Sequence, residues 1–254
     1  MFNKILFIIW YTLRPKYYFH FFSLIKRKFL TNYDTKINRN KAFEWASSNA
    51  VPYNDAMEKL GLNGDKVGLD KDTILEGQIL ATKSSVKMGG PAHIHLIYDC
   101  VRLLGAKRVI ETGVAYGWSS LAILKAFNEN NSCILYSVDM PYPTKNNEND
   151  VGIVVPEFLR KNWQLIRKPD RPGIIEALNR VGGNIDLCHY DSDKSWWGRH
   201  YAYPILWKSL RPKGLFISDD IQDNLYFSNF VKNNSNNFAV VEFEGKFVGL
   251  IRKQ

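Results

Sequence analysis

Three acidic residues lie where short β-rich segments end, and their spacing suits the binding of a cation. Asp191 closes one such segment, and Asp219 and Asp220 close the next one along the chain. Neighbouring parallel strands bring their carboxyl ends to one edge of a sheet, so the three carboxylates should meet there. They would repel one another unless a cation lay between them, and oxygen ligands favour Mg²⁺, Ca²⁺ or Mn²⁺ over Zn²⁺. The structural alternative is that these residues cap the helices that follow, although capping needs one Asp per helix and not an adjacent pair.

A glycine-containing turn is the second group of residues that could bind a ligand. The segment Glu111-Thr-Gly-Val-Ala-Tyr-Gly-Trp-Ser119 joins a β-rich run to a helical one, which lets backbone N–H groups approach a ligand. It is not the dinucleotide motif GxGxxG, because Ala115 occupies the place of the second glycine. Asp139 ends the next β-rich run, 26 residues after Gly113, where an acid can bind two ribose hydroxyls. The pattern E-x-G-x-x-x-G-x-S is similar to the loop that binds S-adenosylmethionine (SAM), which we predict as the cofactor.

The elements that must position these residues alternate along the chain. We predict strands at 108–112, 134–139, 164–167, 185–191, 214–219, 238–243 and 247–251, and helices at 92–104, 118–129, 172–181, 196–209 and 222–232. Such alternation indicates a doubly wound parallel sheet with helices on both faces. The last two strands are separated by only three residues, which predicts an antiparallel hairpin. The predicted fold is therefore α/β, with a mostly parallel, seven-stranded, Rossmann-like sheet, a C-terminal antiparallel hairpin and an N-terminal helical arm.

The positive charge is concentrated at the N-terminus. The formal net charge of the 254 residues is +9, and residues 1–33 contain six basic side chains and no acidic one. The apolar run at 5–13 is too short to span a bilayer, but aromatic and basic residues continue at helical spacing to residue 29. This pattern suits an anionic membrane interface. A pair of helices that covers the catalytic domain or a second copy of the chain is the other interpretation.

The remaining composition narrows the class of protein. Outside the arm the 28 basic and 25 acidic residues nearly balance, so the basic stripe of a nucleic-acid-binding protein is missing. Cys100, Cys133 and Cys188 form no CxxC pair, which argues against disulfides and zinc. We expect reduced, buried cysteines in a cytoplasmic protein, with peripheral membrane contact through residues 1–30 at the inner face of the membrane. The sequence leaves the oligomeric state open.

The motifs together resemble a known family. AKRVIETGVAYGWSSLAIL, VDM, DSDK and SDD occur in the order and spacing of class I SAM methyltransferases of the cation-dependent O-methyltransferase type. These are the catechol and caffeoyl-coenzyme A enzymes, and the chain is also similar to the macrocin-type sugar O-methyltransferases. The resemblance covers roughly residues 76–251. The arm at 1–33 lies outside it. We expect a helical cap at 34–90, which we place over the carboxyl edge of the sheet, and a methyltransferase domain at 91–254.

The resemblance also implies roles for individual residues. Asp191, Asp219 and Asp220 correspond to the metal ligands, with Mg²⁺ as the expected ion, and Lys194 to the catalytic lysine. The implied SAM contacts, with Ala115 counted among the loop residues, are Glu111, Gly113, Ala115, Gly117, Ser119, Asp139 and Met140. The family has Asp-Asn where this chain has Asp219-Asp220, so we expect the metal affinity of this chain to differ from that of the family. The segment 168–173 lacks the family's small-residue turn, so we assign no adenine contact there.

The expected reaction is methyl transfer to a hydroxyl oxygen of a small molecule or glycan, with the cation lowering the pKa of that hydroxyl. Lys194 would take the proton if burial and the cation lowered its own pKa. For His189 we expect a packed core residue, for Asp193 a helix cap, and for Trp196 and Trp197 either a pocket wall or helix packing. Two alternatives stay open: a metal-independent SAM methyltransferase with Asp191 as general base, and a non-catalytic, membrane-attached binding module that keeps the SAM fold. No nucleic-acid partner is expected.

Overall fold

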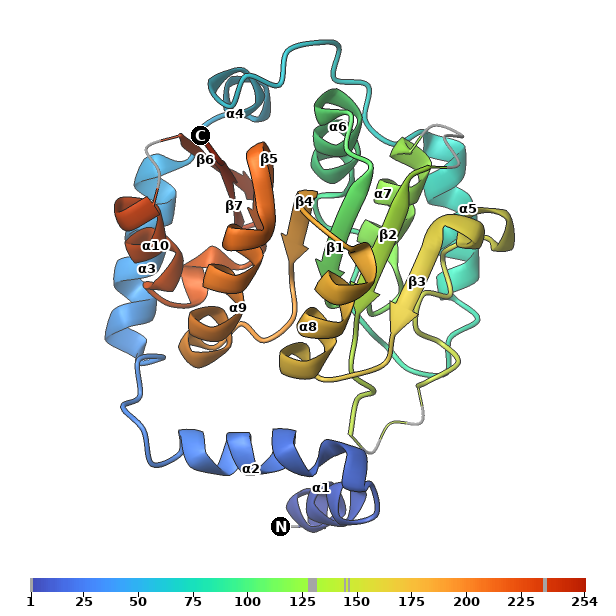
Figure 1. Ribbon diagram of the computed structural model, residues 1–254, viewed down its shortest axis with the longest axis vertical. Coiled ribbons are helices and arrows are strands. Elements are labelled where there is room, and N and C mark those ends of the chain that lie inside the picture. The colour runs from blue at the N-terminus through green and yellow to red at the C-terminus, as the bar shows by residue number, and fades with distance from the viewer. Residues whose placement is uncertain (1, 128–131, 144, 146, 235–236) are drawn as a thin grey trace.

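The central feature of the protein is a seven-stranded sheet, seen in a computed structural model that describes residues 2–127, 132–143, 145, 147–234 and 237–254 (Figure 1). The strand order is β3-β2-β1-β4-β5-β7-β6. The first five strands in this order are parallel, and β7 runs antiparallel to both β5 and β6. The strands are β1 (Arg108–Thr112), β2 (Ile134–Val138), β3 (Trp163–Ile166), β4 (Ile185–Tyr190), β5 (Leu210–Ser218), β6 (Phe238–Phe243) and β7 (Lys246–Arg252). The predicted strands, the predicted hairpin and the predicted fold class are confirmed.

Alternation along the strands divides the apolar side chains between two cores. Successive strand residues point to opposite faces of a sheet, so Val109 belongs to one core and Ile110 to the other. Leu187 and Cys188 on β4 divide in the same way. All of these side chains are fully buried, as expected for a parallel sheet covered on both faces. The three cysteines are free and buried, as predicted.

Helices cover the two faces of the sheet. The helices are α1 (Phe2–Thr12), α2 (Tyr18–Arg27), α3 (Lys36–Asn49), α4 (Tyr53–Lys59), α5 (Lys71–Ala81), α6 (Ile94–Leu104), α7 (Trp118–Ala126), α8 (Asp170–Val181), α9 (Trp196–Ser209) and α10 (Tyr226–Asn234). Three 3-10 segments join them: η1 (Pro15–Tyr17), η2 (Glu157–Asn162) and η3 (Ile221–Asp223). The core with α6 and α7 lies on one face, and the core with α8, α9 and α10 lies on the other. The predicted helix at 222–232 is divided into η3 and α10, and the end of the predicted helix at 118–129 lies outside the described residues.

Segment 34–90 reaches the carboxyl edge of the sheet only in part, where Gly89 lines a cavity. Its helices α3 and α4 pack against β6, α3 also packs against η3 after β5, and Val51 N–H donates to the Val240 carbonyl at 2.9 Å. The reason is aromatic packing: Trp45 of α3 stacks on Phe238 with ring centroids 5.8 Å apart. The helices that lie at the carboxyl edge are those of the N-terminal arm, with α2 stretched across the ends of the parallel strands (Figure 1). Among the described residues, every helix is too short or too polar to cross a membrane.

Candidate active site

The turn after β1 bends sharply because three of its residues adopt positive φ angles. These are Gly113 at 80°, Ala115 at 50° and Gly117 at 93°. A Cβ on Gly113 would lie 2.3 Å from the Asp191 carbonyl oxygen, so only glycine allows the turns after β1 and β4 to approach so closely. A Cβ on Gly117 would lie 2.8 Å from Gly152 Cα. Gly113 therefore places the turn directly against the loop that contains Asp191, and Gly117 places it against the segment that contains Gly152.

Asp139 lies beside this turn, at the end of β2. Its Oδ1 accepts a hydrogen bond from Val114 N–H at 3.1 Å, and its other oxygen pairs with the Arg167 guanidinium. Burial raises the pKa of the Asp139 carboxyl above its usual value, although Arg167 acts in the opposite direction. Asp139 is thus held at the pocket wall by one backbone donor and one cation.

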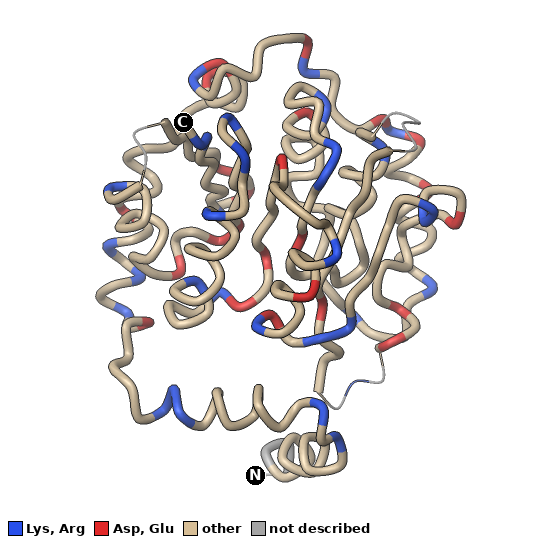
Figure 2. The backbone as a smooth tube through the Cα atoms, viewed as in Figure 1, with Lys and Arg blue, Asp and Glu red and all other residues tan. Residues whose placement is uncertain are grey.

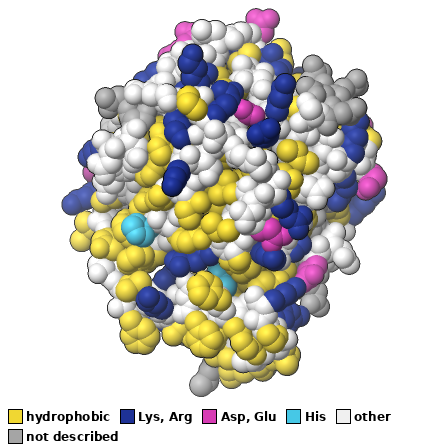
Figure 3. All heavy atoms as spheres, viewed as in Figure 1, with side chains coloured by type: hydrophobic (Ala, Val, Ile, Leu, Met, Phe, Trp, Pro, Cys, Tyr) yellow, Lys and Arg dark blue, Asp and Glu magenta, His cyan; other side chains and the backbone are white. Residues whose placement is uncertain are grey.

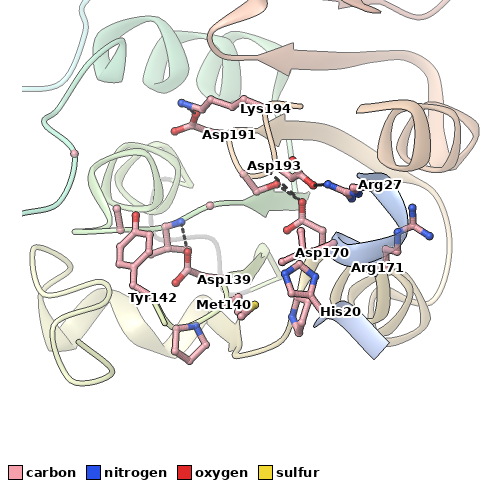
Figure 4. Close-up of a pocket in the computed structure, with 18 residues that line it drawn as sticks. His20, Arg27, Asp139, Met140, Tyr142, Asp170, Arg171, Asp191, Asp193 and Lys194 are labelled. Carbon is pink, nitrogen blue, oxygen red and sulfur yellow. Dashed lines mark hydrogen bonds and ion pairs between the residues drawn. The ribbon is translucent and has the colours of Figure 1, made fainter. Parts of the chain in front are cut away.

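The turn, Asp139 and the loop after β4 enclose a cavity of about 450 Å³ (Figure 4). This volume is in the range of small-molecule sites. Figure 4 shows Asp139 and Met140 on one side of the cavity and Asp191 and Lys194 on another. Of the residues predicted to act in cofactor binding or catalysis, the cavity is lined by Gly113, Ala115, Asp139, Met140, Asp191 and Lys194. A smaller adjoining cavity of about 60 Å³ shares Ala115 and Asp191 with it and adds Ser119 and Asp219.

Lys194 and Asp191 form the charged end of the cavity. Lys194 Nζ lies 2.8 Å from Asp191 Oδ1 and also contacts the Asp220 carboxylate. Burial alone would lower the pKa of Lys194, but the two carboxylates outweigh it and hold this pKa above its usual value. Burial and the neighbouring Asp219 raise the pKa of Asp191 to about 6. The condition for a lysine base, a lowered pKa, is therefore not met in this arrangement, and of these two residues Asp191 is the one that can exchange a proton near neutral pH.

Comparison with known proteins agrees with this geometry. Residues 110–221, which span the turn, Asp139, Asp191 and the Asp219–Asp220 pair, match the family model Methyltransf_24, described as a methyltransferase domain. No curated protein matches the whole sequence significantly.

Solved structures show the same fold for most of the chain. The O-methyltransferase TomG from Streptomyces achromogenes, in complex with SAM, covers 74% of this chain and 92% of its own, with 14% identity and a TM-score of 0.57. An O-methyltransferase from Bacillus cereus with S-adenosylhomocysteine (SAH) covers 82% of this chain and 100% of its own, at 12% identity and a TM-score of 0.56. The SAH-bound methyltransferase PaMTH1 from Podospora anserina covers 87% of this chain and 97% of its own, with 13% identity and a TM-score of 0.54. At these identities the likeness establishes the class I methyltransferase fold.

The segment matched by the family model contains a chain of buried charged side chains next to the cavity. His189 lies between Glu111 and Asp219, with Nδ1 3.6 Å from Glu111 Oε1 and Nε2 3.4 Å from Asp219 Oδ1. Burial alone would lower the pKa of His189, but the two carboxylates raise it to about 10. Glu111 also accepts hydrogen bonds from Ser120 Oγ at 2.5 Å and Ser137 Oγ at 2.7 Å. His189 is a core residue, as predicted, and Glu111 is fully buried on β1 and is not among the residues that line the cavity.

The three predicted metal ligands are paired with basic side chains in this arrangement. In the part of the chain that the structure describes, no cluster of three or more His, Cys, Asp or Glu side chains is placed to hold a metal ion. The Lys194 ammonium lies against both Asp191 and Asp220, and Asp219 is turned to His189. The lysine thus supplies the positive charge that the sequence analysis assigned to a metal.

Several residues around the site have other roles than expected. The N-cap of α9 is Ser195, whose Oγ accepts from Gly198 N–H at 3.1 Å, whereas Asp193 pairs with Arg27 at 2.5 Å. The expected capping role of Asp193 is therefore wrong. Trp196 stacks on Tyr33 with centroids 4.2 Å apart, and like Trp197 it packs at the start of α9 and is not among the cavity-lining residues.

Two sets of residues that line the cavity were not predicted from the sequence. Asp170, at the start of α8, lines the cavity and accepts a hydrogen bond from Ser192 Oγ at 2.6 Å. Burial raises the pKa of this carboxyl to about 6. The presence of this acidic residue in the segment Lys168–Gly173 was the sequence feature that could have indicated its role. The second set is His20, Leu24 and Arg27 of α2, which no local motif connects to a site formed more than 80 residues later.

Proposed function

We propose that this protein is a SAM-dependent O-methyltransferase that acts on a hydroxyl of a small molecule or glycan. The observation that carries the proposal is that the cofactor turn, Asp139 and the Asp191–Lys194 pair open into one cavity. Family and fold support methyl transfer in general, and the solved O-methyltransferases with the same fold support oxygen as the acceptor atom.

The residues present fit SAM. Positive φ angles turn the Gly113–Gly117 segment so that its backbone faces the cavity, and Asp139 offers carboxylate oxygens where a ribose would lie. When bound, SAM supplies an electrophilic methyl group, which passes to the acceptor oxygen as the carbon–sulfur bond breaks and a carbon–oxygen bond forms. Met140 adds an apolar wall beside Asp139. The chain's contribution is mainly the positioning of donor and acceptor.

Asp191 and Lys194 have different roles at the acceptor oxygen. Asp191, with its pKa raised to about 6, is ionised at neutral pH and basic enough to accept the hydroxyl proton. Lys194 keeps its proton, because Asp191 and Asp220 hold its pKa above the usual value. It therefore orients the Asp191 carboxylate and stabilises negative charge that develops on the acceptor oxygen.

A cation-assisted reaction is the second candidate, and one observation favours it. Asp219 Oδ1 is buried and lies 3.4 Å from His189 Nε2, but it receives no hydrogen bond of good geometry from the described residues. A carboxylate oxygen with such a weak partner at this edge is a potential ligand for a divalent cation such as Mg²⁺, which would require Lys194 to move away from the carboxylates. A calorimetric titration of the SAH-saturated protein with Mg²⁺, with Asp219→Ala alongside, decides between the two candidates. Binding that is lost in the variant supports the cation, and the absence of binding supports the metal-independent reaction.

Methyl transfer from tritium-labelled SAM tests the main proposal. Catechol and a sugar with vicinal hydroxyls serve as probes, because the sequence did not distinguish between these acceptor types. Lys194→Met should abolish most transfer, while the exposed Lys232→Met should leave it unchanged and serves as the matched control. If the protein binds SAH but transfers no methyl group to any hydroxyl probe, the non-catalytic binding module becomes the better explanation.

A further inference from the structure

The N-terminal arm, which we define as residues 2–30, has a large apolar outer face. Phe19, Phe22 and Phe29 are 71%, 63% and 84% exposed, and Leu13 is 71% exposed. Ten of the nineteen large hydrophobic residues that are exposed on the described chain lie in this arm, namely Ile5, Leu6, Ile8, Ile9, Leu13, Tyr18, Phe19, Phe22, Ile25 and Phe29. Figure 3 shows this concentration of hydrophobic side chains over the lower edge of the molecule. A contiguous apolar surface of this kind marks an interaction site.

The inner side of the same arm belongs to the cavity. His20, Leu24 and Arg27 of α2 line it, and Arg27 pairs with Asp193 of the opposite wall at 2.5 Å. The arm also has its own small core of Trp10, Tyr11 and Tyr17, against which Met140 packs directly after the ribose-binding acid. The inner side of the arm therefore packs against the cavity, whereas its outer side has no packing partner among the described residues.

Electrostatics decides what can cover the outer face. Residues 1–33 contain no acid, and Lys16, Lys26 and Lys28 are exposed beside the apolar side chains. Figure 2 shows basic residues at both ends of α2 and no acidic residue on α1 or α2. A second copy of the chain docked symmetrically would bring two such cationic surfaces together, which is unfavourable. An anionic lipid surface offers both the negative charge and the apolar interior that this face lacks.

We propose that the outer face of the arm docks on the interface of an anionic bilayer, so that the mouth of the methyl-transfer cavity opens at the membrane surface. α2 would lie in the interface, with the aromatic side chains inserted and the lysines among the lipid headgroups. The consequence for the acceptor rests on the proposed function: a hydroxyl carried by a membrane-borne amphiphile reaches Asp191 without leaving the bilayer. The arm then acts both as membrane anchor and as wall of the acceptor site.

Vesicle sedimentation tests the docking. The full chain should sediment with phosphatidylcholine vesicles that contain phosphatidylglycerol, and should bind pure phosphatidylcholine vesicles much more weakly. The double variant Phe22→Glu/Phe29→Glu should lose at least about tenfold in vesicle affinity, because two inserted rings are replaced by charges. The matched control is Leu75→Glu, which changes a side chain that is 56% exposed on α5, outside the arm. Equal binding by the parent and the double variant, or binding that does not depend on phosphatidylglycerol, would overturn the proposal.

A fluorescent label tests which face enters the lipid. The native cysteines are buried, so the Phe22→Cys variant can be labelled selectively with a polarity-sensitive dye. The emission of the dye should shift to the blue on addition of the anionic vesicles, whereas the same dye on the Leu75→Cys variant should not respond. SAH titrations of every variant separate the two proposals. A parent that binds SAH but stays in the supernatant, or that forms a dimer abolished by Phe22→Glu/Phe29→Glu, overturns the docking and leaves the methyltransferase function standing. Loss of SAH binding in the parent would instead overturn the proposed function.

Discussion

Replacing Gly113 with alanine should separate cofactor binding from general stability. The new Cβ would lie 2.3 Å from the Asp191 carbonyl oxygen and 2.7 Å from its carbonyl carbon. Gly113 also has a φ of 80°, which costs an L-residue about 1–2 kcal/mol. Relief of the clash adds a cost similar to that of overpacking, about 1–3 kcal/mol. The turn and the Asp191 loop must therefore move apart, and both of them line the cofactor cavity.

Gly182 provides the matched control for this substitution. It has a similar φ of 65° at the end of α8, but a Cβ there would meet no atom within 4 Å. Gly182→Ala thus has the backbone cost without the clash, and it lies outside the residues that line the cavity. Chemical denaturation and calorimetric titration with SAH measure the two effects separately.

We expect Gly182→Ala to lose about 1–2 kcal/mol of unfolding free energy and to bind SAH like the parent. Gly113→Ala should lose more stability and at least about tenfold in SAH affinity, since about 1.4 kcal/mol corresponds to a factor of ten. If folded Gly113→Ala bound SAH with parental affinity, the assignment of this turn to the cofactor would be refuted.

Three further outcomes follow from the site and its support. The rate constant kcat/KM should rise with pH up to about 6 and then level off, because Asp191 must be ionised to accept a proton. An activity that does not change with pH over this range would exclude Asp191 as the base. Lys194→Met should leave SAH affinity unchanged but shift that pH dependence upward, since removal of the ammonium raises the pKa of Asp191; an unmoved profile would contradict the pairing. Asp99→Ala should lower the unfolding free energy by at least about 2 kcal/mol, because the fully buried Asp99 accepts hydrogen bonds from Tyr53 Oη at 2.5 Å and Gly68 N–H at 3.0 Å. An unchanged urea denaturation curve would contradict this.

The sheet could be predicted because its signals are local. Strands such as β1 and β4 are short apolar runs between turns, and their alternation with helices implies parallel pairing. The turn at Gly113 could be predicted for the same reason, since positive φ angles and a following helix are encoded within a few residues. Asp139 and Asp191 then reached one cavity because the topology brings the strand ends together.

The features that could not be predicted depend on contacts distant in sequence. The packing of α3 against β6 comes from aromatic pairs such as Trp45 and Phe238, which are separated by most of the chain. The charge state of Lys194 depends on Asp220, which the fold brings within contact from another strand. The contribution of Arg27 to the cavity wall is likewise visible only once α2 lies across the carboxyl edge. Residue types and spacing contain none of this information.

The most direct test of the central claim is a calorimetric titration with SAH of the parent, Asp139→Ala and Asp72→Ala. Asp139 lines the cavity, whereas Asp72 is exposed in the first turn of α5. We predict that the parent and Asp72→Ala bind one equivalent of SAH with the same affinity, and that Asp139→Ala binds it at least about tenfold more weakly. A parent that does not bind SAH, or an Asp139→Ala protein that binds it as tightly as the parent, would contradict the assignment of this cavity to the methyl donor.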